Sequence, residues 1–123
     1  MSACYSVTAR IAVKDRHGAS AVIRDYIRQH DGVDCDFALD DWQAEHISEY
    51  TFDGLMRIVF AGWQDSEFNV RRESDFLIYT SGFNASYGWE MVMLDVVELL
   101  RPFLKPKSCI RIWCDVGSHT IKV

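Results

Sequence analysis

Cysteine and histidine are the residues of this chain best suited to metal or nucleophile chemistry, and the sequence has four of each. Cys109 and Cys114 are five positions apart, so on a regular strand their side chains point to opposite faces and do not share an ion. Cys114 and His119 flank a four-residue turn and are possible neighbours across a hairpin, but two ligands do not make a zinc site. The CxxC and HxxxH spacings of such sites are absent from the sequence. We therefore expect structural thiols, and neither a metal nor a cofactor.

The same residues offer few arrangements for nucleophilic catalysis. A thiol and a base can be written down as Cys35 with His46, or as Cys114 with His119, but nothing in the spacing requires either pair. The sequence contains no G-x-S-x-G motif, no Walker loop and no G-x-G-x-x-G motif, so hydrolase and phosphate-cradling chemistry lose their usual support. A non-catalytic protein is the favoured interpretation, and no catalytic residue is predicted.

The chain has one marked charge asymmetry, an acidic stretch over residues 31–53. This stretch contains no Lys or Arg and has eight acids: Asp31, Asp34, Asp36, Asp40, Asp41, Glu45, Glu49 and Asp53. Such a stretch either attracts a basic protein partner or forms a solvated loop that only improves solubility. For the first interpretation, the candidate partner-binding residues are Asp34, Asp36, Asp40, Asp41, Glu45 and Glu49. Calcium is disfavoured, because the order of residues 31–36 is not that of an EF-hand loop.

A second candidate site is the predicted junction of a strand and a helix at residues 83–90. Tyr87 and Trp89, together with His119, define the alternative hypothesis: a small-molecule-binding protein or small enzyme with a pocket between the sheet and the helices. The structural interpretation instead assigns Ser86 to a helix cap and the two aromatic residues to the helix entry. The tryptophans are expected in the core or on a sheet face: Trp42, Trp63, Trp89 and Trp113.

Strands and helices must position the candidate residues, and the spacing of apolar residues along the chain predicts where these lie. Strands are predicted at residues 5–13 and 76–83, helices at 19–30 and 88–104, and a closing hairpin at 109–114 and 119–123. Residues 35–39, a short apolar run in an acidic surround, are either a further strand or a loop. This order predicts an α+β fold: a two-layer sandwich in which two helices pack on one face of a mainly antiparallel sheet. We expect a single domain over residues 1–123, because no repeat, linker or low-complexity segment interrupts the chain.

Residues 47–63 fit two structures. Two apolar runs, 47–52 and 55–63, are separated by Asp53 and Gly54, a dipeptide that supplies the positive φ angles of a type I′ turn, so a hairpin is predicted. One helix across 51–61 is the competing interpretation, since apolar residues also recur there at helical spacing. The hairpin is favoured because of Gly54 and because aromatic and β-branched residues are enriched.

Composition limits the class of protein. The chain has 123 residues, of which 49% are hydrophobic, and a net charge of −5, with a pI near 5.2. The negative net charge disfavours direct binding to nucleic acid, because the phosphate backbone of nucleic acid is also negative and attracts cations. No apolar run approaches the roughly 20 residues of a membrane span and no signal peptide is recognised, so we expect a cytoplasmic protein with reduced cysteines and no membrane partner. The oligomeric state stays open, and the terminal strand at 120–123 offers an edge for a homodimer.

The C-terminal third resembles a pattern in small acidic uncharacterised bacterial proteins, many of which are encoded among phage or mobile-element genes. The pattern consists of Trp89 and Glu90 at the start of a helix, the helix end at residues 100–104 and a following strand at 108–115. The resemblance implies a bacterial accessory or interaction protein. It brings no activity and no catalytic residues.

Overall fold

The computed structural model describes residues 2–32, 39–62 and 67–123, which form five β-strands, four α-helices and two short 3-10 helices. In chain order these are β1 (Ser2–Ile11), α1 (Arg16–His30), α2 (Asp41–His46), η1 (Ile47–Glu49), α3 (Phe52–Phe60), β2 (Glu67–Glu73), β3 (Phe76–Ser86), α4 (Trp89–Leu100), η2 (Arg101–Phe103), β4 (Cys109–Cys114) and β5 (Gly117–Lys122). All strand pairs are antiparallel. The predicted α+β class and antiparallel sheet are confirmed, whereas the prediction of two helices is wrong.

The sheet is built around β1, which has a neighbour on each side in the order β2-β3-β1-β4-β5. β1 pairs with β3 over its whole length, from Ser2 opposite Ser86 to Ile11 opposite Leu77. Burial alternates along β1, because successive side chains of a strand point to opposite faces: the odd-numbered residues are buried and the even-numbered residues are more exposed. This alternation confirms the strand predicted at 5–13, which the structure starts earlier and ends at Ile11.

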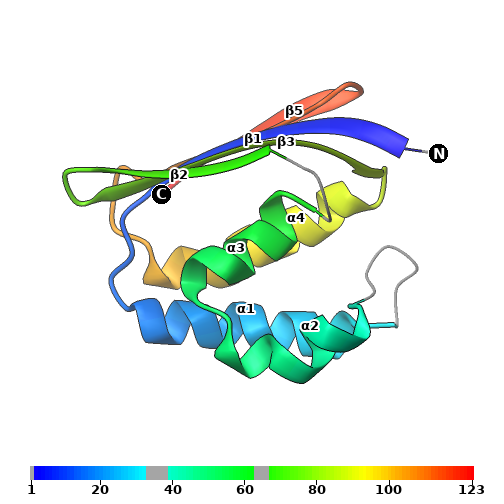
Figure 1. The fold of residues 1–123 in the computed structure, drawn as a ribbon. Helices are drawn as coiled ribbons and strands as arrows, with labels where there is room; N and C mark the ends of the chain where they lie inside the picture. The colour runs from blue at the N-terminus through cyan, green and yellow to red at the C-terminus, as the bar shows by residue number, and fades with distance from the viewer. Residues whose placement is uncertain (1, 33–38, 63–66) are drawn as a thin grey trace.

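The described helices lie on one side of the sheet, and the other side is open (Figure 1). In this view α3 and α4 lie next to the sheet, whereas α1 and α2 lie farther from it (Figure 1). α1 packs against both α3 and α4. Because α3 has neighbours on several sides, six of its nine residues are buried: Phe52, Leu55, Met56, Ile58, Val59 and Phe60.

Trp89 joins two of these helices. Its side chain lies at the start of α4, is only 1% exposed, and donates a hydrogen bond from Nε1 to the main-chain oxygen of Val59 in α3 at 2.8 Å. A buried indole needs such an acceptor, since an unsatisfied N–H in the core costs free energy. This bond fixes α4 against α3 within the core.

The hairpin predicted at residues 47–63 is wrong, because the described part of this segment is helical. The Thr51 hydroxyl accepts a hydrogen bond from the Gly54 N–H at 3.1 Å, which makes Thr51 the N-cap of α3. Asp53 and Gly54 therefore lie in the first helical turn rather than in a β-turn. The favourable interaction of Asp53 with the positive end of the helix is consistent with this placement.

The remaining predictions have mixed outcomes. The closing hairpin is confirmed as β4 and β5, although its turn has two residues, Asp115 and Val116, instead of four. The helix predicted at 88–104 is shorter and ends at Leu100, followed by η2. Residues 35–39, expected as a strand or a loop, lie almost entirely outside the described residues. β2 is not predicted from the sequence, because only Phe68 and Val70 alternate there with polar residues and the remainder of the strand is charged.

We predict that Trp89→Phe destabilises the protein by about 1–3 kcal/mol, because it removes the indole donor and leaves the Val59 carbonyl buried without this partner. Urea unfolding measures this change in the free energy of unfolding. Trp113→Phe is the matched control, since Trp113 is 52% exposed, and it should change the stability by less than about 0.5 kcal/mol. Equal effects of the two substitutions would contradict the role of Trp89.

Candidate functional site

The acidic candidate residues lie on the side of the molecule opposite the sheet, in and beside α2 (Figure 1). The described members of the set are all exposed: Asp40, Asp41, Glu45 and Glu49. Asp34 and Asp36, the other two, lie outside the described residues. The structure therefore brings four of the six candidate acids together on one short helix and the turn that follows it.

α2 is stabilised by its N-terminal cap rather than by burial, because none of its residues is buried. The Asp40 carboxylate accepts from the Gln43 N–H at 2.7 Å, and the Gln43 side chain accepts from the Asp40 N–H at 3.1 Å, a reciprocal capping box. η1 follows, and Arg24 of α1 donates to Ile47 O at the start of η1 at 3.2 Å and to Tyr50 O, directly after η1, at 3.1 Å. Arg24 thus fastens the acidic segment to α1.

Trp42 is the most exposed tryptophan that the structure describes, with 60% of its surface accessible. Its ring stacks on His46 with 4.3 Å between the ring centroids, and His46 Nδ1 lies 2.8 Å from the Trp42 carbonyl. Glu49 is 4.0 Å from Nε2 of the same histidine. We call the exposed residues Asp40, Asp41, Trp42, Glu45 and Glu49 the acidic tip. The expectation that Trp42 lies in the core or on a sheet face is not met, because it lies on a helix without buried residues.

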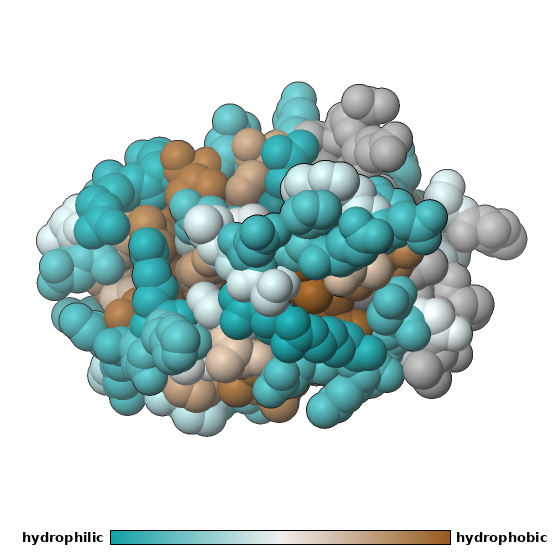
Figure 2. Space-filling model, turned by 60° about the horizontal axis from the view of Figure 1, so that its bottom comes forward, coloured by the Kyte–Doolittle hydropathy of each residue, from teal (hydrophilic) through white to brown (hydrophobic). Residues whose placement is uncertain are grey.

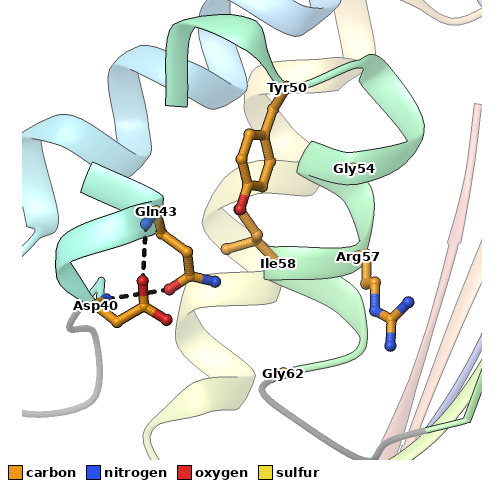
Figure 3. A pocket seen from close by; sticks show the side chains of 7 residues that line it. All are labelled: Asp40, Gln43, Tyr50, Gly54, Arg57, Ile58 and Gly62. Atoms are coloured by element: carbon orange, nitrogen blue, oxygen red, sulfur yellow. Dashed lines mark hydrogen bonds between the residues drawn. The ribbon is translucent and has the colours of Figure 1, made fainter. Parts of the chain in front are cut away.

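The helix side of the molecule is mainly hydrophilic, and apolar atoms appear in the hollows between polar side chains (Figure 2). One hollow of about 240 Å³ lies between α2 and α3 and is lined by Asp40, Gln43, Tyr50, Gly54, Arg57, Ile58 and Gly62 (Figure 3). Burial and the nearby Asp40 carboxylate raise the pKa of Tyr50, although a hydrogen bond with the Gln43 side chain acts in the opposite direction. This hollow combines an acid, an aromatic ring and an aliphatic floor beside the acidic tip.

A second hollow of about 430 Å³ lies where the starts of α1 and α3 meet η1. Its basic lining residues are Arg16, His17 and Arg24. Arg24 already donates to two main-chain carbonyls, and the Arg16 guanidinium lies 5.9 Å from the ring centroid of Phe52. Two of the three basic groups are therefore engaged in contacts that hold the helices together.

The three residues of the alternative pocket lie in different surroundings. Trp89 belongs to the core, whereas Tyr87 is 39% exposed. His119 contacts the Glu90 carboxylate of α4 through Nε2. Tyr5 stabilises this junction, because its hydroxyl lies 2.8 Å from Ser86 O and 3.1 Å from Tyr87 O. The junction residues hold β3, α4 and β5 together.

The thiol beside this junction is not activated for nucleophilic attack. Cys114 is buried, and its Sγ donates to Asp115 Oδ1 at 3.3 Å. Burial, and then the acidic side chains of Asp115 and Glu90, raise the Cys114 pKa, although a backbone hydrogen bond from Val116 acts in the opposite direction. A thiol with a raised pKa stays protonated and is a poor nucleophile. Within residues 2–32, 39–62 and 67–123, no group of three or more His, Cys, Asp or Glu side chains is placed to hold a metal ion.

No protein-family model, curated protein or solved structure matches this chain. None of the helices in the described ranges is both long enough and apolar enough to cross a bilayer.

We predict that Tyr5 contributes to a loss of stability in alkali. Burial, with Cys114 and Glu90 nearby, raises the Tyr5 pKa from 10.0 to about 12. Since the folded pKa is above the unfolded one, this contribution to stability is fully present below about pH 10 and is lost as the pH rises towards the folded pKa. Urea unfolding at about pH 9 and about pH 11 should show a smaller alkaline loss for Tyr5→Phe than for the wild type. Tyr79 also has a raised pKa and accounts for part of the remaining loss. An unchanged alkaline loss in Tyr5→Phe would contradict this role.

Proposed function

We propose that this chain is a non-catalytic accessory protein that binds a basic protein partner through the acidic tip. The observation that carries the proposal is the exposed Trp42 within a stretch, residues 31–53, that has eight acids and no Lys or Arg. A large exposed aromatic side chain costs hydration free energy in the free protein, and tryptophan is enriched among residues that dominate binding energy at protein interfaces. The surrounding acids supply the electrostatic attraction.

The carboxylates and the tryptophan of the acidic tip contribute to binding in different ways. Exposed carboxylates such as Asp41, Glu45 and Glu49 attract a basic partner at a distance and so raise its association rate. Binding is salt-dependent, because added salt shortens the distance over which opposite charges attract each other. The carboxylates contribute less to affinity, since exposed ion pairs are worth little in water. Trp42 then supplies the apolar contact that a desolvated interface needs.

The hollow between α2 and α3 gives the partner a place for one side chain. A Lys or Arg stem fits against Tyr50 and Ile58, and its charge reaches the Asp40 carboxylate. Arg57 lines the same hollow but points away from Asp40 (Figure 3). A basic side chain of the partner can therefore contact an acid and an aliphatic surface in this hollow without lying next to the positive charge of Arg57.

Other features support the same reading. The resemblance of the C-terminal third to small acidic bacterial proteins fits an accessory role, and an inhibitor that mimics the charge of nucleic acid is one form of it. The three described cysteines are free thiols, which suits the reducing cytoplasm. The fold also fits, because it separates a helix side that carries the acidic tip from a sheet side (Figure 1).

The alternative is a small-molecule-binding protein or small enzyme that uses Tyr87, Trp89 and His119. It is less favoured because Trp89 is 1% exposed and holds α4 to α3, so its ring is occupied by core packing. His119 is likewise engaged by Glu90.

The first test is a capture experiment from a lysate of the source cells, at low and at high salt, with retained proteins identified by mass spectrometry. We expect a basic partner that is retained at low salt and lost at high salt. Trp42→Ala should weaken its affinity roughly 30-fold, the size of a binding hot spot. Asp41→Lys/Glu45→Lys/Glu49→Lys should abolish capture, because it does not merely remove three acids but places three like charges against the basic partner. Capture that is equal for the wild type and both variants would refute the proposal, and an empty capture would favour the small-molecule alternative.

A second triple variant controls for net charge alone. Glu67→Lys/Glu73→Lys/Asp75→Lys changes three exposed acids on and beside β2, which lies in the sheet, whereas α2 lies on the opposite side of the molecule (Figure 1). Each acid-to-lysine change adds two charges, so both triple variants move the net charge from −5 to +1. The β2 variant should retain the partner, and thermal unfolding should verify that each variant is folded. Loss of capture in both triple variants would contradict a localised site.

A further inference from the structure

The open side of the sheet carries a regular array of side chains from β1, β4 and β5. The strand registers align them in three rows: Ser6, Trp113 and Ser118; Thr8, Arg111 and Thr120; Arg10, Cys109 and Lys122. We call these nine residues the open β-face. None of the nine is buried, and seven are exposed. They alternate with the buried residues of β1 and β4, which face the helices, so they lie on the other side of the sheet.

The open β-face is positively charged. Its ionisable side chains with a fixed charge are Arg10, Arg111 and Lys122. The acids on the same side of the sheet, Glu67 and Glu73, belong to β2, which β3 separates from β1, and Glu73 pairs there with Arg71 at 3.6 Å. The Arg10 guanidinium lies 3.7 Å from the ring centroid of Phe76 on β3, so it is held over the sheet. In the part of the chain that the structure describes, neither Arg111 nor Lys122 pairs with an acidic side chain.

A hollow of about 260 Å³ lies within this array, lined by Thr8, Arg10, Cys109 and Arg111. The row next to Arg111 is occupied by Trp113, which is 52% exposed. Its cross-strand neighbours are Ser6 and Ser118, whose short side chains leave the indole accessible. Residues two apart on one strand lie about 6.7 Å apart, so the indole and the Arg111 guanidinium are adjacent groups on the same face of β4.

We propose that the open β-face binds single-stranded nucleic acid, with an unpaired base stacked on Trp113 and the neighbouring phosphates held by Arg111, Arg10 and Lys122. Base stacking on an exposed aromatic ring, combined with cations that follow the backbone, is the chemistry by which open surfaces bind single strands without reading a sequence. A duplex keeps its bases stacked on one another, so Trp113 has nothing to stack on there. The serine and threonine hydroxyls of the array are further donors to phosphate oxygens.

The proposal departs from the expectation of no direct nucleic-acid binding, which rested on the net charge of the whole chain. The total of −5 includes −8 from residues 31–53, so the rest of the chain carries +3. The acidic tip and the open β-face lie on opposite sides of the molecule (Figure 1). Electrostatic attraction is screened beyond about 8–10 Å at ordinary ionic strength, so the local charge decides what each face binds.

The test is fluorescence anisotropy of labelled oligo-dT and oligo-U of about 12 nucleotides, titrated with the full chain at low salt. We expect saturable binding, with a slope of about −2 for log affinity against log salt, since each of three phosphate contacts on a single strand contributes about −0.7. Trp113→Ala should weaken binding about tenfold. Trp42→Ala, which removes the exposed tryptophan of the acidic tip, should leave it unchanged.

Two exposed arginines of the helices control for charge. Arg111→Gln/Lys122→Gln should abolish most binding, whereas Arg28→Gln/Arg57→Gln, with the same change in net charge, should retain it. No binding at low salt would overturn the proposal, as would equal affinity for a duplex of the same length. Full competition by polyglutamate, or unchanged affinity in Trp113→Ala, would show a general affinity for polyanions and would overturn it as well. Because this test uses no protein partner, its outcome is independent of the proposal for the acidic tip.

Discussion

The register of β1 is the constraint on which the rest of the structure depends. β1 lies at the centre of the sheet and is paired on both sides, so its alternation decides which face of β3 and of β4 meets the helices. A slip of one residue would expose Tyr5 and Val7 and would turn Arg10 towards the core. Because such a slip exchanges an apolar face for a polar one, a single register is strongly favoured. The polar composition of the open side of the sheet is the other half of the same alternation.

How well a helix or strand can be predicted from the sequence depends on whether its apolar residues repeat clearly at the spacing of a helix or at that of a strand. Residues of β1 alternate without interruption, and α4 has an apolar stripe that matches only a helix, so both are identified from the pattern. Residues 51–61 match both periods, and the deciding signal is the cap: Thr51 binds the Gly54 N–H, a local bond that hydropathy does not contain. β2 has only a short apolar face, Phe68 and Val70, because it is an edge strand with mostly exposed side chains, of which Phe68 packs against the core.

For the candidate site, too, some features can be predicted from the sequence and others cannot. The concentration of acids is a property of composition and can be read from the sequence. The exposure of a side chain depends on tertiary packing. Trp42 is therefore exposed and Trp89 buried, although Trp89 is the first residue of its helix and Trp42 the second residue of its own. Their neighbours carry a usable signal: apolar residues follow Trp89 at helical spacing, whereas polar and acidic residues surround Trp42. A tryptophan without apolar partners on its own helix face is a candidate for a surface contact.

The thiols of β4 illustrate what alternation means for redox chemistry. Cys109 lies on the open face of the sheet beside Arg10, whereas Cys114, five residues later, lies buried on the helix side. The strand itself separates them, so they do not form a disulfide with each other. Cys4 is also exposed and shares the open face with Cys109, because both occupy outward positions of neighbouring strands. Of the three described thiols, an oxidant in solvent therefore reaches the two on the open face, and a disulfide formed there links the sheet to another molecule and leaves the core unchanged.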